Sequence, residues 1–165
     1  MAVLPIRVGG DLILRQKTRR VKVIDASIQR LIDDMIETMH AAPGVGLAAP
    51  QVGSPLRIAV IEVPEQEVIV LVNPEIVRRS GERRVEEGCL SVPGYVAEIT
   101  RSQFVVVKSL DREGRPQRTR AREDVLAQAL EHELDHLNGV LYIDYLESLD
   151  QLVKLEPQDD ASREL

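Results

Sequence analysis

A stripe of apolar residues runs along the segment from Asp25 to Ala42, at three- and four-residue spacing. This period predicts an amphipathic helix with one side against the core. Asp25 or Ser27 is placed to cap its first turn, and Pro43-Gly44 would end it. An amphipathic N-terminal helix is therefore expected.

The middle of the chain is rich in β-branched residues. These runs predict strands at Arg57–Val63, Val68–Val72, Tyr95–Thr100, Phe104–Leu110 and Gln117–Ala121. A short polar connection joins the first two into a hairpin, and Asp111–Gly114 is a turn signal between the last two. A second helix is expected from about Glu123 to Leu137, with Asn138-Gly139 as its stop. This order of elements indicates an α+β fold of antiparallel sheets packed around a central helix.

The length of 165 residues argues for one domain, which we place at residues 1–156. Residues 157–165 are polar and are expected to lack ordered structure. A single cysteine, Cys89, excludes an intrachain disulfide. No apolar run is long enough for a secretory signal or a membrane span, so a cytoplasmic protein without a membrane partner is expected.

Acidic residues outnumber basic ones, 27 to 21, which gives a formal net charge of −6. Binding to nucleic acid needs a basic surface, so this balance argues against a general affinity for it. No direct nucleic-acid partner is expected. A net charge does not fix how the charges are distributed, and a local basic patch is compatible with it.

The strongest chemical signal is His132-Glu133-Leu134-Asp135-His136. Residues four apart lie one turn above each other on a helix, so the two histidines point the same way and can share one metal ion. Glu133 lies about 100° around the helix, close enough to reach a water on that metal. A helix rich in His, Glu and Asp can also be a solvated surface, but the helical context favours a metal site.

The same helix has a metal side and a packing side. Val125 and Ala129 fall within about 60° of His132, on the metal side. Three leucines gather at about 120–160° and are expected to face the core: Leu126, Leu130 and Leu137.

Two histidines leave a catalytic metal one protein ligand short. An aspartate, a glutamate, Cys89 or His40 can complete the set. Cys89 stands in Glu87-Gly88-Cys89-Leu90-Ser91, and its thiolate would be a strong ligand, although a lone cysteine is more often a small buried hydrophobe. His40 near the end of the first helix is also explained by the helix dipole. The residues alone leave the third ligand open.

A glycine-rich segment spans residues 44–53 (GVGLAAPQVG) and lacks the Gly-Lys-Ser/Thr ending of a phosphate loop. Its small residues would let a substrate backbone come close. The amide of Gln51 can donate to a developing oxyanion, but an ordinary loop glutamine is the simpler interpretation of this segment taken alone.

Three segments together closely resemble the peptide deformylase family: Gly44–Gln51, Glu87–Ser91 and His132–His136, in that order. The resemblance extends from Val3 to about Leu146. It implies a metal-dependent hydrolase that removes the N-formyl group from the N-terminal formylmethionine of nascent polypeptides and releases formate.

By this resemblance the metal ligands are Cys89, His132 and His136, with water in the fourth position. Glu133 would be the general acid and base, and Gln51 with the backbone N–H of Leu90 would stabilise the oxyanion. The metal is expected to be Fe²⁺ natively, with Zn²⁺, Ni²⁺ or Co²⁺ able to replace it. The implied partners are an N-formylmethionyl peptide and, transiently, the ribosome.

The methionine side chain of such a substrate needs an apolar pocket beside the metal. We expect Val45, Val125 and Ala129 to line it and Gly46 to pair with the extended peptide backbone. One position departs from the family pattern, because Glu131 stands where Gln is common. Its carboxylate would either raise the basicity of the ligands or face solvent.

Two other functions fit part of the pattern. A zinc metallopeptidase also uses His-Glu-x-x-His, but its third ligand is usually His or Glu, and no histidine follows His136. A non-catalytic metal-binding module would want four protein ligands, and there is no second cysteine beside Cys89. The shortage of ligands favours an open, catalytic site.

Overall fold

The computed structural model describes residues 1–156. Its two α-helices are α1 (Ala26–Ala41) and α2 (Val125–Leu137). Its strands are β1 (Gly46–Ala48), β2 (Ile58–Ile61), β3 (Ile69–Ser80), β4 (Arg83–Cys89), β5 (Val92–Arg101), β6 (Phe104–Leu110), β7 (Pro116–Arg122) and β8 (Val153–Lys154). The expected α+β architecture is confirmed, whereas the tail at 157–165 lies outside the described residues. Within residues 1–156, no helix has both the length and the hydropathy needed to cross a membrane.

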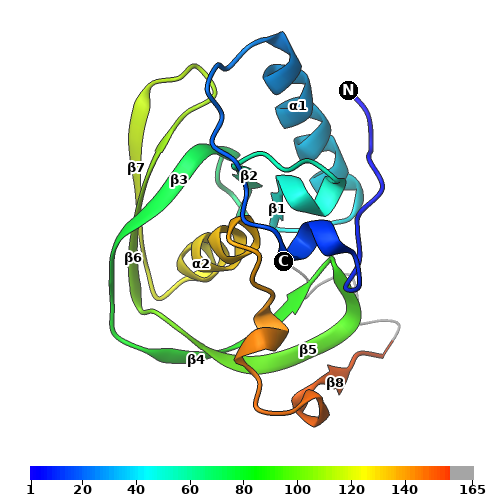
Figure 1. Ribbon diagram of the computed structural model, residues 1–165. Coiled ribbons are helices and arrows are strands. Elements are labelled where there is room, and N and C mark those ends of the chain that lie inside the picture. Colours follow the sequence, from blue (N-terminus) through cyan, green and yellow to red (C-terminus); the bar gives the residue numbers. More distant parts are fainter. Residues whose placement is uncertain (157–165) are drawn as a thin grey trace.

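The strands form two antiparallel sheets. One has the order β1-β2-β3-β6-β7 and the other the order β4-β5-β8. Only two residues, Gly81 and Glu82, separate the long strand β3 from β4, so the chain passes directly from one sheet to the other. Figure 1 shows the strands curving around α2, with α1 on the far side of β1 and β2. The central helix of the predicted fold is therefore α2.

Both helices begin at an aspartate whose side chain accepts a hydrogen bond from the first turn. Asp25 accepts from the N–H of Ile28 at 3.1 Å, so it caps α1 in place of Ser27. Asp124 accepts from the N–H of Ala127 at 2.8 Å and caps α2. The preceding residue, Glu123, has a φ of 49°, which no helix can include, so α2 starts two residues later than predicted.

At its centre the five-stranded sheet is apolar on both faces, because a helix packs against each face. One cluster joins the α2 leucines to one face: Leu126, Leu130, Leu134, Leu137, Val105, Val107, Leu71 and Ala59. A second cluster joins α1 to the other face: Ile32, Met35, Met39, Leu47, Ile58, Val60 and Val72. Each such side chain contributes about 1.5–3 kcal/mol when fully buried, so α2 is held firmly beneath the sheet.

The sequence pattern missed strand β4 and the second half of β3. The region from Val77 to Cys89 carries four arginines and three glutamates. The buried end of β4 consists of Glu87, Gly88 and Cys89 in place of large apolar residues. A strand whose inward side chains are charged or small shows no hydrophobic alternation, so the pattern could not reveal it.

Candidate metal centre

Three side chains that can bind a metal meet below the end of β4. Cys89 closes β4, and His132 and His136 lie one turn apart on α2. The Sγ of Cys89 lies 3.2 Å from Nε2 of His136, which lies 3.2 Å from Nε2 of His132. Two nitrogens bound to one tetrahedral ion at 2.0–2.1 Å are about 3.3 Å apart, so this spacing fits a shared metal ion. All three residues are at most 2% exposed.

Two N–H donors face the sulfur of Cys89. The backbone N–H of Ser91 lies 3.4 Å from Sγ, and Nε2 of Gln51 lies 3.8 Å from it. Donors of this kind stabilise a thiolate, which is the form of cysteine that binds metals. The donor set is thus one sulfur and two imidazole nitrogens, which suits zinc, iron, nickel or cobalt better than magnesium or calcium.

The orientation of His132 is set by Glu87, two residues before Cys89 on β4. Nδ1 of His132 bonds to Oε1 of Glu87, which leaves Nε2 directed at the cluster. Burial opposes a charge on either group, yet their mutual attraction prevails. It raises the pKa of His132 well above its ordinary value and, together with Arg101, lowers the pKa of Glu87 to about 2. A metal ion would displace the proton at Nε2 and keep the Nδ1–H donated to Glu87.

Arg101 extends this network from the far end of β5. Its guanidinium donates to both carboxylate oxygens of Glu87 and, through Nη1 at 2.7 Å, to Asp135. Asp135 also accepts from the hydroxyl of Tyr145 at 2.7 Å. Since Arg101 is 4% exposed and Glu87 1% exposed, both charges are paired inside the protein. None of these partners belongs to the set predicted from the sequence.

Glu133 is the unpaired carboxylate of the site. It is fully buried, and neither of its oxygens has a hydrogen-bond partner among the described residues. A Cβ on Gly46 would overlap its Oε2, so only glycine lets the carboxylate lie against strand β1. Burial raises the pKa of Glu133 to about 7. A carboxyl group with this pKa can take up and release a proton near neutral pH.

Gln51 is fully buried on the other side of the cysteine. Its Oε1 accepts from the N–H of Ala48 at 2.9 Å, and its Nε2 donates to the hydroxyl of Ser91 at 3.0 Å. These bonds fix which end of the amide faces Cys89. The donor end, Nε2, therefore points to the place where the three ligand atoms meet.

Comparison with known proteins agrees with this geometry. The sequence model of the polypeptide deformylase family matches residues 3–152. The chain belongs to the peptide deformylase family. A peptide deformylase of Dehalococcoides mccartyi (strain CBDB1) is 54% identical over 166 aligned residues, covering 100% of this chain and 99% of that protein. One of Rhizobium meliloti is 50% identical over 154 residues, covering 90% and 88%.

Solved structures of this family have the same fold. The peptide deformylase of Legionella pneumophila superposes with a TM-score of 0.88 at 47% identity, covering 91% of this chain and 89% of that one. The enzyme of Synechococcus elongatus, in complex with actinonin, gives 0.85 at 42% identity, covering 90% and 81%. This chain is accordingly a hydrolase that removes the formyl group from nascent peptides. The metallopeptidase and the non-catalytic module are set aside.

The remaining predicted residues differ in how far their side chains are exposed to solvent. Val45 is half-buried just before β1, and Ala129 is fully buried on α2. Val125 opens α2 and is 45% exposed, so its placement beside the substrate stays a prediction. His40 lies on the surface, where it pairs with Glu62 at 3.0 Å, and it is not part of the ligand cluster.

Glu131 does not face solvent, and that alternative was wrong. It is 4% exposed, and its carboxylate accepts from the backbone N–H of Ser102 at 2.6 Å and from the Ser102 hydroxyl at 3.0 Å. Arg79 on β3 lies 3.3 Å from it. The hydrogen bonds from Ser102 to Glu131 therefore connect α2 to the turn between β5 and β6.

The contact between Glu87 and His132 yields a measurable expectation. Replacing Glu87 with glutamine keeps the shape of the side chain but removes the charge that holds Nδ1–H, so the metal should bind about 10–100-fold more weakly. Titration of the metal-free protein with Zn²⁺ and a competing chromophoric chelator measures this. Gln128→Ala is the control, because it removes a neutral donor to Glu87 at 3.2 Å and to the carbonyl of Glu86 at 3.0 Å. Equal affinities in the Glu87→Gln variant and the parent would contradict the assignment.

Proposed function

We propose that Cys89, His132 and His136 hold one divalent ion, natively Fe²⁺, and that the enzyme acts on the formylmethionine at the start of new polypeptides in the cytoplasm. The observation that carries this proposal is the buried Glu133 carboxylate, which has no hydrogen-bond partner among residues 1–156 and belongs to the helix of both histidines. A thiolate beside two imidazoles suits Fe²⁺ and equally accommodates Zn²⁺, Ni²⁺ or Co²⁺.

Formamides are unreactive, so the reaction needs a strong nucleophile at neutral pH. When bound, the metal would supply it by lowering the pKa of water. Glu133 takes the proton released in that step and later delivers it to the departing amine. Its burial suits both roles, because a carboxyl group with a pKa of about 7 holds the proton between the two steps.

We assign the stabilisation of the tetrahedral oxyanion to Nε2 of Gln51 and to the backbone N–H of Leu90. Gln51 supports this role because its Oε1 is anchored to Ala48, which turns the amide hydrogens toward Cys89. Leu90 follows Cys89 directly, so its N–H belongs to the peptide bond that joins it to Cys89. A preorganised donor of this kind is worth about 3–4 kcal/mol in the transition state.

Strand β1 is the edge of its sheet, and an extended peptide can add to such an edge as another strand. Gly46 would pair with the peptide backbone, and Val45 would border the methionine side chain. A cavity of about 390 Å³ is lined by Val45 and Val63 and also by polar residues such as Glu62. Val125 and Ala129 on α2 do not line this cavity, and we place them in the methionine pocket because they share the side of α2 that carries His132.

Ala129 offers a direct test of that pocket. In the Ala129→Leu variant the KM for formyl-Met peptides should rise, since a larger side chain fills the space of the methionine. Ala127→Leu is the matched control, because Ala127 is equally buried on α2 but lies away from the histidines. Both variants should lose about 1–3 kcal/mol of stability through overpacking. An unchanged KM in a folded Ala129→Leu variant would count against the pocket.

The identity of the metal is tested separately from the activity. Protein purified anaerobically is loaded with Fe²⁺ or with Zn²⁺, and formate release from a formyl-Met tripeptide is measured in air and under argon. The Fe²⁺ form should be the more active and should lose activity in air, because a ferrous ion with a thiolate ligand is open to oxidation. A Zn²⁺ form at least as active, together with zinc in the protein as isolated, would overturn the assignment of iron.

A further inference from the structure

The five-stranded sheet has a second face, turned away from α2. Near β1 and β2 this face is covered by α1, which packs on Val60 and Val72, and the packing extends to Leu110 at the end of β6. Farther along β3, β6 and β7 most outward side chains are exposed. Figure 1 shows α1 beside β1 and β2, and β6 and β7 at the outer margin of the molecule.

Strand register places nine outward side chains in three rows across β3, β6 and β7. We call them the basic face: Glu75, Lys108 and Arg118; Arg78, Val106 and Arg120; Ser80, Phe104 and Arg122. Five of these nine are cations and one is acidic, although the whole chain has a net charge of −6. Charge is therefore distributed unevenly, and the overall balance hides a strongly positive surface.

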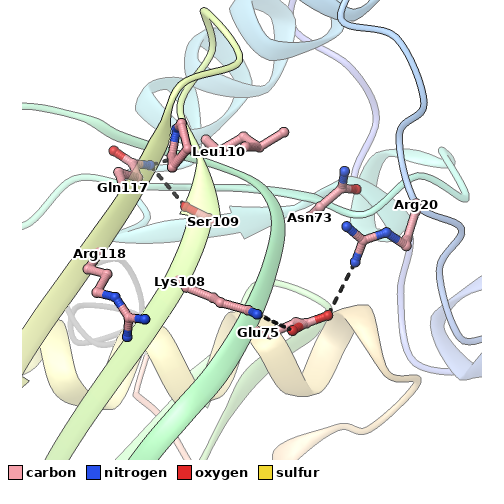
Figure 2. Close-up of a pocket in the computed structure, with 9 residues that line it drawn as sticks. Arg20, Asn73, Glu75, Lys108, Ser109, Leu110, Gln117 and Arg118 are labelled. Carbon is pink, nitrogen blue, oxygen red and sulfur yellow. Dashed lines mark hydrogen bonds and ion pairs between the residues drawn. The ribbon is translucent and has the colours of Figure 1, made fainter.

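One end of the basic face opens into a cavity of about 400 Å³, shown in Figure 2. Arg20, Lys108 and Arg118 contribute cations to its wall, and Glu75 is the one carboxylate there. Glu75 is shared, since Lys108 lies 3.5 Å from it and Arg20 lies 3.2 Å from it. The cavity thus keeps an excess of positive charge.

The arginines of the basic face have no carboxylate partner within residues 1–156. Arg78 and Arg122 lie over the ring of Phe104, at 5.7 Å and 4.8 Å from its centre. Arg118 and Arg120 form no ion pair with any described residue. Elsewhere many arginines are paired, as Arg84 is with Glu98. Four guanidinium groups on one face therefore have no carboxylate partner in the described part of the chain and are available to an external anion.

The geometry of β7 indicates the kind of anion. Alternate residues of a strand point the same way about 7 Å apart, so Arg118, Arg120 and Arg122 form a straight row. A guanidinium binds a phosphate through two parallel hydrogen bonds, and a row of them fits a chain of phosphates. We propose that the basic face binds the phosphate backbone of RNA.

Two observations favour RNA bound without regard to sequence. Guanidinium groups already cover Phe104, so its ring is not a free platform for stacking bases, and contacts to the backbone remain. This inference rests on the proposed function, in which the substrate is a nascent peptide leaving a ribosome, and the surface of a ribosome is rich in RNA phosphate. The basic face also lies across the sheet from α2, so bound RNA would leave the metal cluster accessible.

The test measures binding of a fluorescein-labelled RNA hairpin of mixed sequence by fluorescence anisotropy, with the full-length, metal-loaded protein. Affinity should fall about 10²-fold between 50 and 200 mM salt if about four phosphates are contacted. Combined replacement of Arg118, Arg120 and Arg122 by glutamine should weaken binding at least about tenfold and lower the salt slope by about 3. Formate release from a small formyl-Met peptide should stay at the parental rate, which also verifies folding.

A matched control changes three exposed cations that do not belong to the basic face: Lys17, Arg30 and Lys154, each to glutamine. It should bind RNA like the parent. Equal weakening in both triple variants would overturn the proposal, because net charge alone would then explain binding. The absence of RNA binding at 50 mM salt would also overturn the proposal. The arginines would then be explained as charges that prevent another strand from pairing with the edge strand β7. Stronger binding to phosphatidylserine vesicles than to RNA would also overturn the proposal.

Discussion

Replacing Glu133 with glutamine should lower kcat for formyl-Met peptides by about 10²–10⁴-fold while the metal stays bound. Glutamine has nearly the same shape and still fits against Gly46, but it cannot take up a proton. The ligand atoms of Cys89 and the two histidines are untouched. Steady-state formate release, with metal content measured on the same sample, tests this expectation.

Glu131→Gln is the control, because Glu131 is a second buried carboxylate two residues away on α2. It bonds to Ser102 and Arg79, so its replacement should cost stability and leave kcat within a few-fold of the parent. The Glu133→Gln variant, by contrast, should lose kcat and gain stability, the latter measured on metal-free protein at pH 8. This pH lies above the pKa of Glu133, which is about 7, so the buried carboxyl group is ionised and lowers the free energy of unfolding. Glutamine removes that cost. A Glu133→Gln enzyme with parental kcat would refute the role of Glu133 as base.

The helices and the central strands could be predicted because their hydrophobic pattern coincides with their packing. The stripe of α1 contains Ile32, Met35 and Met39, and all three are fully buried. The runs that became β2 and the first part of β3 pair antiparallel, as the hairpin prediction required. Where a strand packs through polar or small side chains, as β4 does, the hydrophobic pattern does not predict the strand.

The ligand cluster could be predicted from local spacing, but its supporting network could be predicted only in part. Glu87 and Cys89 are two apart, which places both on one face of a strand, so a sequence signal for Glu87 existed once β4 was recognised. Arg101 offered no such signal. It lies 34 positions before Asp135 and 14 after Glu87, and only the fold of β5 against α2 brings the three together.

The basic face is a second feature that could not be predicted from the sequence. Composition argues against a general affinity for nucleic acid, but it does not fix how the charges are distributed, so it could neither reveal nor exclude a local basic patch. The register of β6 and β7 instead aligns Lys108 with Arg118 and Val106 with Arg120. Alternation of Arg with Thr and Ala along β7 was visible in the sequence, but only strand pairing shows that Arg78 from β3 joins the same face.

Removal of the metal should abolish activity and leave the fold intact. The hydrophobic clusters on both sides of the sheet do not involve the ligands, apart from Cys89 in a small third cluster. The Glu87–Arg101 pair also holds His132 in place without a metal. Far-ultraviolet circular dichroism of chelator-treated protein should therefore match that of the parent, and formate release should fall to background.

Stability should fall along with activity, because an ion that binds only the folded state adds about 2.7–4.1 kcal/mol when it is present at 100–1,000 times its Kd. For a domain of this size that is a drop in Tm of about 5–15 °C. One equivalent of Fe²⁺ or Zn²⁺ should restore both the Tm and turnover. In Cys89→Ala, which lacks the thiolate, the same chelator should change the Tm little, since this variant holds the ion weakly to begin with. If metal-free protein kept the parental turnover, the cluster of Cys89, His132 and His136 could not be the catalytic centre.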